Sequence, residues 1–247
     1  ELYLAVGPSL DLAGLLGELA AELHDALRRA DASTPIWFTG LYQRSLYQSM
    51  SGSLRTVTRQ LRGSPAAIEP ELVERAQLRI AELRRPKMRA IRTQIHGNLH
   101  LGRLLWDGTR FALLDVAGDL SQPVDARLIK RSPLRDIASL LLSLDEIAYE
   151  AAVEAAHRAN AAPRAFANWA ERWFVAMAAV LWHTYRARLQ ELAPSTGIVP
   201  DEPAEARLLL DLYTLQGRCL AVVAAQPRGA DHVAQSVDAL RRVIARL

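Results

Sequence analysis

The sequence predicts a mainly α-helical fold that carries one β-hairpin near its middle. Long stretches have apolar residues three or four positions apart, which is the spacing of a helix face. Residues 101–116 instead hold two apolar runs separated by Asp107-Gly108, a dipeptide typical of tight hairpin turns. With 247 residues, 50% hydrophobic and 23% charged, the chain can bury a substantial core.

Charge and cysteine content exclude several classes of protein. The 30 basic and 27 acidic residues leave a net charge of +3, which does not indicate a nucleic-acid-binding surface. The single cysteine, Cys219, excludes an internal disulfide and, inside an apolar run, is expected to be a buried thiol. The longest apolar run, residues 173–182, is about half the length of a membrane span, and the N-terminus has no signal pattern. We therefore expect a cytoplasmic protein with no membrane segment.

Three helices are predicted before the hairpin, at residues 10–29, 41–61 and 68–84. Pro8 or Ser9 is expected to begin the first of them. A short strand at residues 91–95 then precedes the hairpin strands, residues 101–106 and 111–116.

Helices resume after the hairpin. Ser132-Pro133 is a helix start, with serine as N-cap and proline at the first helical position, and this helix is expected to reach about Asn160. Residues 194–203 form the longest predicted loop. Three further helices are predicted at residues 163–189, 204–225 and 231–246.

Candidate reactive side chains concentrate around the hairpin. His96 and His100 have the spacing of a helical metal pair, but Gly97 and the strand-like flanks favour a loop in which the histidines form hydrogen bonds. Asp115 follows an apolar strand and precedes a glycine-containing turn. A carboxylate there can hold Mg²⁺ or cap the turn, and the spacing leaves both interpretations open.

Two weaker patterns also have a structural alternative. Ser132 with Arg131 and Arg135 could hold a phosphate at a helix N-terminus, although helix capping is the favoured interpretation. Four aromatic residues at roughly helical spacing could form a sugar platform but are more typical of a core: Trp169, Trp173, Trp182 and Tyr185. Trp182, His183 and Tyr185 are the candidates for sugar binding.

Four segments resemble the aminoglycoside-phosphotransferase-like kinases, and in particular their maltokinase branch. The first is His96-Gly-Asn-Leu-His100, followed by a hairpin and Asp115. The others are residues 41–50 (Leu-Tyr-Gln-Arg-Ser-Leu-Tyr-Gln-Ser-Met), residues 130–136 (Lys-Arg-Ser-Pro-Leu-Arg-Asp) and residues 21–24 (Ala-Glu-Leu-His). The resemblance covers essentially the whole chain.

The resemblance implies a fold and an activity. Residues 1–247 would form a protein-kinase-like C-terminal lobe, with the catalytic segment at residues 91–119 and a helical part at residues 133–247. The N-terminal lobe that grips ATP in such kinases has no counterpart in this sequence. The implied reaction is ATP-dependent phosphorylation of maltose, with Mg²⁺ as cofactor, in a protein that is often fused to trehalose synthase.

The resemblance also implies roles for individual residues. Asn98 would orient the sugar hydroxyl and Asp115 would hold Mg²⁺, with His96 and His100 binding the sugar. Arg103 would face phosphate. Arg135 and Asp136 would support the catalytic loop.

Three positions depart from the kinase pattern. Asn98 stands where the family has an aspartate base, Arg103 where it has an amide near the metal, and Ala117 where it has a second carboxylate. An amide cannot accept the hydroxyl proton, and a guanidinium cannot ligate Mg²⁺. Two hypotheses therefore remain: a sugar kinase, or a catalytically inactive module that stabilises or regulates a fused or partner trehalose synthase.

Overall fold

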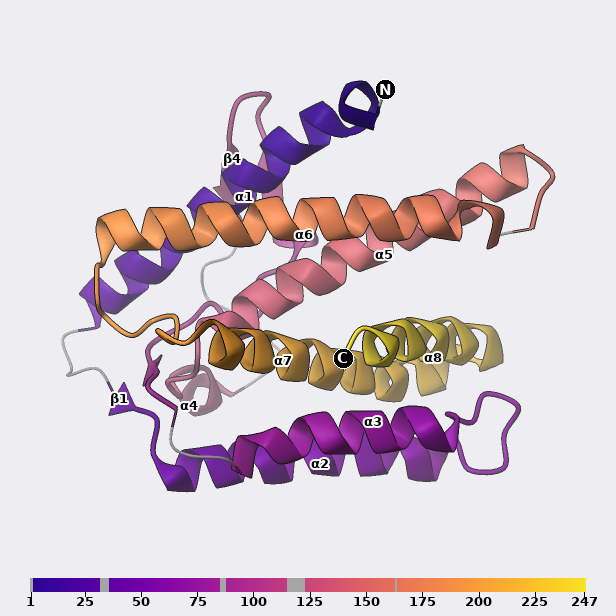
Figure 1. Ribbon diagram of the computed structural model, residues 1–247, viewed down its shortest axis with the longest axis horizontal. Coiled ribbons are helices and arrows are strands. Elements are labelled where there is room, and N and C mark those ends of the chain that lie inside the picture. Colours follow the sequence, from indigo (N-terminus) through magenta and orange to yellow (C-terminus); the bar gives the residue numbers. More distant parts are fainter. Residues whose placement is uncertain (1, 32–35, 85–87, 115–122, 163) are drawn as a thin grey trace. The chain divides into compact units, whose positions relative to one another are not determined.

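In the part of the chain that the structure describes, the chain folds into helices, with strands confined to two short pairs (Figure 1). A computed structural model describes residues 2–31, 36–84, 88–114, 123–162 and 164–247. It divides into two compact units. Unit 1 comprises Glu1–Pro35 and Thr93–Thr196, and unit 2 comprises Ile36–Arg92 and Gly197–Leu247. Each unit is therefore assembled from two separate stretches of chain.

Unit 1 is built on three long helices: α1 (Leu2–Ala30), α5 (Leu134–Arg158) and α6 (Arg164–Leu192). α1 and α5 both pack against α6. The expected start of α1 is wrong, because the helix begins at Leu2 and continues through Pro8. Proline removes one helical hydrogen bond, but its ring holds φ at the helical value, so the helix continues past it.

α1 approaches α6 closely at one glycine. A Cβ added at Gly17 would lie 2.5 Å from the Leu181 carbonyl oxygen and 2.9 Å from the Tyr185 backbone nitrogen. One turn earlier, a Cβ at Gly14 would meet only the Thr184 hydroxyl at 3.8 Å and a Val180 methyl at 3.9 Å. The separation of the two helix backbones is therefore set at Gly17, where any side chain would collide with backbone atoms.

The ends of α5 follow from local sequence. The predicted start is one residue early, because α5 begins at Leu134 with Pro133 at the N-cap position. The Ser132 hydroxyl still accepts a hydrogen bond from the Leu134 amide at 3.3 Å, as a capping serine does. At the other end Asn160 adopts a left-handed conformation with φ of 48°, and the Ala161 amide donates to the Ala156 carbonyl at 2.9 Å. Asparagine tolerates this conformation, so the helix stops where the sequence predicts.

The hairpin is present as predicted. β3 (Leu104–Trp106) pairs antiparallel with β4 (Phe111–Leu113), and Leu104 lies opposite Leu113. In the turn, the Asp107 carboxylate accepts from the Thr109 and Arg110 amides at 2.8 and 2.9 Å, and these bonds lower the pKa of Asp107.

The first hairpin strand is shorter than the predicted residues 101–106. Its first half is a 3₁₀ turn, η2 (Leu101–Arg103), in which the Arg103 amide donates to the His100 carbonyl at 2.9 Å. The chain has to turn here, out of the preceding loop and into β3. A short helix, α4 (Val124–Arg127), follows the hairpin along the chain.

Unit 2 contains the helices α2 (Gly40–Gln60), α3 (Pro70–Ala81), α7 (Pro203–Ala225) and α8 (Ala230–Ala245). The predicted third helix, residues 68–84, is shorter because its last turn tightens into the 3₁₀ helix η1 (Glu82–Arg84). A second 3₁₀ helix, η3 (Gln226–Arg228), joins α7 to α8. Arg79 on α3 pairs with Asp211 on α7 at 2.6 Å, and Arg241 on α8 pairs with Glu69 at 2.9 Å. These pairs tie the helices of unit 2 together at its surface.

α7 is the core helix of unit 2. It is long and apolar enough to cross a membrane by length and composition, but 56% of its apolar window is buried inside the protein. Cys219 lies on its buried face, and burial raises the pKa of the thiol to about 12. The expectation of a buried thiol is confirmed.

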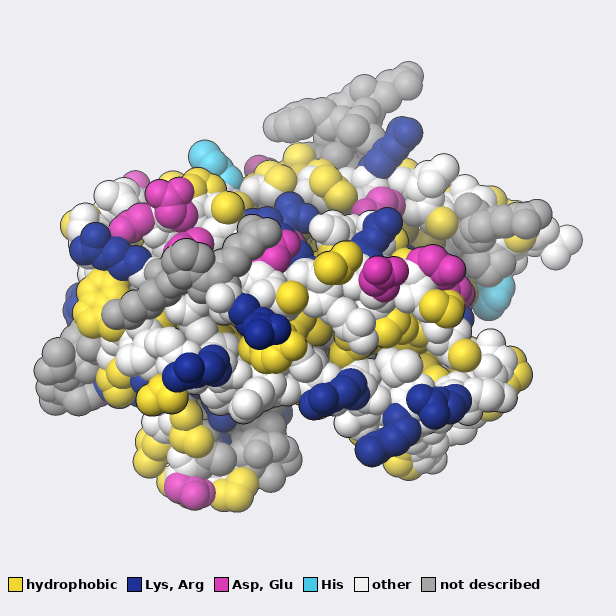
Figure 2. All heavy atoms as spheres, turned by 60° about the horizontal axis from the view of Figure 1, so that its bottom comes forward, with side chains coloured by type: hydrophobic (Ala, Val, Ile, Leu, Met, Phe, Trp, Pro, Cys, Tyr) yellow, Lys and Arg dark blue, Asp and Glu magenta, His cyan; other side chains and the backbone are white. Residues whose placement is uncertain are grey.

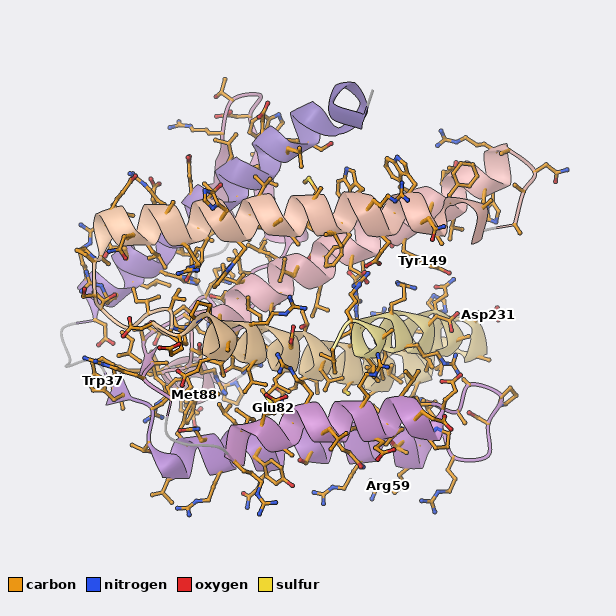
Figure 3. The ribbon with its side chains drawn as sticks, in the orientation of Figure 1. Trp37, Arg59, Glu82, Met88, Tyr149 and Asp231 are labelled. Carbon is orange, nitrogen blue, oxygen red and sulfur yellow. The ribbon has the colours of Figure 1, made fainter. Side chains whose placement is uncertain are left out.

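The small sheet of unit 2 includes a strand that the sequence did not predict. β1 (Ile36–Trp37) pairs antiparallel with β2 (Ile91–Arg92), so the predicted strand at residues 91–95 is shorter. Gly197, with φ of 75°, lets Trp37 pack closely, because a Cβ there would lie 2.9 Å from the ring (Trp37 is labelled in Figure 3).

The face drawn in Figure 2 carries lysine and arginine side chains in separate groups, with hydrophobic and acidic side chains between them.

Gly17→Ala should destabilise the protein by about 1–3 kcal/mol, because the new methyl would overlap backbone atoms of α6 that cannot rotate away. Gly14→Ala is the matched control, since its methyl fits and alanine favours a helix by about 0.5–1 kcal/mol. Urea unfolding followed by circular dichroism measures both. Equal stability of the two variants would contradict the close approach.

Candidate functional site

The candidate site is the loop that joins β2 to the hairpin. The loop is held at its start, where Thr93 and Arg131 exchange two backbone hydrogen bonds of 3.0 and 2.9 Å. Gly97 then turns the chain with φ of 79°. No atom lies within 4 Å of a Cβ built there, so the need for glycine is conformational rather than steric.

The buried carboxylate of Asp136 anchors the loop through hydrogen bonds to its backbone. Asp136, in the first turn of α5, is 0% exposed. Its Oδ2 accepts from the His96 amide and its Oδ1 from the Gly97 amide, both at 2.8 Å. Hydrogen bonds to an ionised acceptor are roughly twice as strong as neutral ones, so this pair fixes the backbone on both sides of the turn.

Two residues from other helices complete the buried cluster. His24 on α1 places Nε2 3.3 Å from Asp136 Oδ2 and Nδ1 2.9 Å from Tyr185 Oη on α6. Both side chains are 0% exposed. Burial, and then the charge of Asp136, raise the pKa of Tyr185 well above its usual value. Sequence reasoning did not connect His24 with Asp136, although the segment at residues 21–24 carried part of the resemblance.

Within the loop, the histidines differ in their surroundings. His96 is buried, and its Nδ1 accepts from the Asn98 amide at 3.2 Å. This is the loop-holding arrangement that the hydrogen-bond interpretation describes. His100 is partly buried, and burial first and then the positive charge of Arg103 lower its pKa, while Glu146 acts in the opposite direction. Asn98 and Arg103 are both partly exposed on the same loop.

The described residues do not include Asp115, on which the magnesium interpretation depends. Among them, no group of three or more His, Cys, Asp or Glu side chains is placed to hold a metal. Asn98 offers an amide oxygen, whereas Arg103 has donors only. Asp115, the predicted ligand, and Ala117 lie outside the described residues.

The phosphate interpretation at the start of α5 is not favoured by the geometry. Ser132 is buried and its hydroxyl caps the helix. Arg135 is bonded through its backbone, where its amide donates to the Ser132 carbonyl at 3.1 Å and its carbonyl accepts from Ser139 at 3.2 Å. The hydrogen bonds described here from α5 to the turn at His96 and Gly97 come from Asp136.

The aromatic residues of α6 divide between core and surface. Tyr185 is fully buried and Trp182 stacks on it, with ring centroids 5.9 Å apart. Trp173 packs against a small alanine cluster of α5 and α6. The core interpretation is wrong for Trp169, which is 44% exposed. His183, a candidate for sugar binding, is also exposed.

Comparisons with known proteins show the fold. No model of a known protein family matches the chain. It is similar to a solved structure of glucosamine kinase in complex with glucosamine, ADP and inorganic phosphate, with 20% identity and a TM-score of 0.73 over 98% of this chain and 52% of that one. Two glucosamine kinase crystal forms match at 21% identity. Form A has a TM-score of 0.77 over 98% and 51% of the two chains, and form B has 0.73 over 98% and 54%.

This likeness confirms the predicted kinase-like, mainly helical fold. The chain spans about half the length of the glucosamine kinases that it matches. At this identity the likeness concerns the fold alone.

Asp136→Asn should destabilise the protein by about 3 kcal/mol, because the new amide group would face a backbone N–H that needs an acceptor. Hydrogen exchange of the His96 and Gly97 amides, measured by NMR, should accelerate together with the loss in urea unfolding. Asp125→Asn removes an exposed carboxylate of the same unit and should change stability by less than about 0.5 kcal/mol. Unchanged exchange at both amides would contradict the role of the carboxylate.

Arg103→Gln should raise the pKa of His100 toward its usual value, because it removes a positive charge that disfavours the imidazolium. Glu146→Gln should lower the same pKa further, because it removes the opposing negative charge. Titration of the His100 ring by NMR measures both variants. Shifts of the same sign would mean that one of these charges does not act on His100.

The lowered pKa of His100 also has a consequence for stability. The unfolded chain protonates His100 more readily than the folded protein does. His100 therefore leaves the free energy of unfolding unchanged above about pH 6.5, its usual pKa, and lowers it progressively as the pH falls below that value. His100→Gln should remove this part of the acid sensitivity, which urea unfolding at pH 5 and pH 8 measures. An unchanged difference between the two pH values would contradict this account.

Proposed function

We propose that this chain is the C-terminal lobe of an ATP-dependent sugar phosphotransferase. The observation that carries the proposal is the Asp136-anchored loop, residues 96–103, which leads directly into a hairpin. The likeness to glucosamine kinases over 98% of the chain supports it. In the proposal, residues 1–247 act together with an N-terminal lobe that binds most of the nucleotide.

The loop can position groups and neutralise charge, which are the larger part of catalysis in phosphoryl transfer. Asn98 orients the sugar hydroxyl that attacks the terminal phosphorus of ATP. The new P–O bond forms on the sugar, ADP leaves, and the hydroxyl proton goes to solvent, because the amide cannot accept it. Arg103 pairs phosphate oxygens, while His100 contacts the sugar.

His96 and Arg135 have less direct roles in the proposal. The buried His96 ring keeps the Asn98 amide in place, so it shapes the sugar-binding side of the loop from within. Arg135, next to Asp136 on α5, keeps its proposed role as support for the loop. Asp115 remains the proposed Mg²⁺ ligand.

We propose maltose as the sugar, phosphorylated at the anomeric hydroxyl to maltose 1-phosphate. This choice rests on the resemblance to maltokinases, carried by residues 41–50 and 130–136. One solved structure that this chain resembles contains glucosamine, which makes glucosamine the competing substrate. A fused or partner trehalose synthase and a cytoplasmic location belong to the same proposal.

A second candidate function is a catalytically inactive module that stabilises or regulates such a partner. The observation that favours it is the charge of the loop, where Arg103 is close enough to lower the pKa of His100. A fixed guanidinium repels a divalent cation, and Asn98 supplies no base. Calorimetry with ATP and Mg²⁺ helps to separate the two functions, because Mg²⁺-dependent nucleotide binding counts against the inactive module.

ADP release by the full-length polypeptide that carries this chain, measured separately with maltose, glucose and glucosamine, tests the proposed function. We expect release above the rate without sugar, and the fastest release with maltose. Faster release with glucosamine would replace the proposed substrate. Release that no sugar stimulates would overturn the kinase and favour the inactive module.

Asn98→Asp alone should leave sugar-dependent ADP release unchanged, because the new carboxylate would pair with Arg103. Asn98→Asp together with Arg103→Gln should raise it, by up to the roughly 10²–10⁴-fold of a general base. Such a non-additive pair is expected for neighbours in one site. Full rescue by the single substitution would show that Arg103 does not control this position.

A further inference from the structure

A buried polar cluster joins three helices of unit 1 beneath the loop. Tyr185 comes from α6, His24 from α1 and Asp136 from α5, and all three are 0% exposed. They form one hydrogen-bonded line, with 2.9 Å between Tyr185 Oη and His24 Nδ1 and 3.3 Å between His24 Nε2 and Asp136 Oδ2. The reaction proposed above assigns no part to His24 or Tyr185.

The direction of these hydrogen bonds follows from the chemistry of the groups. The Asp136 carboxylate only accepts, so His24 Nε2 carries a proton and donates it. The hydroxyl of Tyr185 keeps its own proton, because burial raises its pKa. In a neutral imidazole, His24 Nδ1 accepts from this hydroxyl, whereas in an imidazolium it would donate to it. We assign the neutral ring with its proton on Nε2, which engages both ring nitrogens.

The donor from His24 has a specific effect on the carboxylate. Asp136 Oδ2 accepts hydrogen bonds from the His24 ring and the His96 amide, while Oδ1 accepts one from the Gly97 amide. Rotation of the carboxylate would break all three bonds at once. Because Asp136 and His24 are fully buried, breaking these bonds is costly, so the carboxylate keeps one orientation and the turn at Gly97 keeps its shape.

We propose that His24 and Tyr185 are positioning residues for the loop that carries Asn98. His24 Nε2–H sets the orientation of Asp136, and the Tyr185 hydroxyl sets the tautomer of His24. The inference rests on the proposed function for its catalytic consequence, whereas the positioning itself is a property of the fold.

Two amide substitutions of His24 separate positioning from packing. The amide nitrogen of glutamine reaches about as far as Nε2, so His24→Gln keeps a donor for Asp136. Asparagine reaches only as far as Nδ1, so His24→Asn loses that donor while remaining polar. Hydrogen exchange of the His96 and Gly97 amides should be about tenfold faster in His24→Asn than in His24→Gln. Equal exchange in the two variants would overturn the proposal, because only side-chain size would then matter.

Tyr185→Phe tests the second link while retaining the ring that packs on Trp182. Without the hydroxyl donor, His24 Nδ1 should gain protonated character, which ¹⁵N NMR of the imidazole detects. The native protein should show a protonated Nε2 and an unprotonated Nδ1. A protonated Nδ1 in the native protein would overturn the assignment.

Activity supplies the catalytic readout in the full-length polypeptide. His24→Asn should lower kcat about tenfold with KM for the sugar unchanged, and His24→Gln should recover most of that loss. If no sugar stimulates ADP release, the proposed function fails, but the exchange and NMR results still decide whether His24 and Tyr185 position the loop. If activity is present and the two His24 variants lose kcat equally, the positioning role is overturned while the kinase stands.

Discussion

A buried carboxylate with three N–H donors organises unit 1. An ionised side chain removed from water costs several kcal/mol unless donors surround it. Asp136 meets this requirement with the His96 and Gly97 amides and the His24 ring. The start of α5, the turn of the loop and one face of α1 are thereby bound to a common point. The close approach at Gly17, two turns before His24 on the same helix, keeps α1 near enough to α6 for the ring to reach Tyr185.

The residues that hold the loop are buried, whereas the side chains with proposed catalytic roles are partly exposed. The residues below it are buried, so replacing any one of them leaves an unpaired polar group and destabilises the protein. Asn98 and Arg103 are partly exposed, so they can change without such a cost. A loop of this construction can keep its shape while its reactive side chains change. This physical separation explains why both an active kinase and an inactive module remain compatible with one scaffold.

Local patterns in the sequence predicted the helices and the hairpin, since periodicity and the Asp107-Gly108 turn act over a few residues. They missed β1, whose two residues are too few to form a pattern. They also missed the first residues of α1, which begins at Leu2, before Pro8. Asp136 was identified through a family resemblance. The contacts of His24 could not be predicted, because 112 and 161 residues separate it from Asp136 and Tyr185. No local rule connects positions so far apart in a single sequence.

The divided path of the chain has a consequence during synthesis. α1 ends at Ala30, but α6, the helix against which it packs, begins roughly 130 residues later. At ribosomal rates of roughly 5–20 residues per second, this interval is on the order of ten seconds. Throughout it, the apolar stripe of α1 lacks α6, the helix that covers most of it, while residues 36–92 emerge and form α2 and α3. The nascent chain therefore exposes a long amphipathic helix, the type of surface that chaperones bind, until the second half of unit 1 leaves the ribosome.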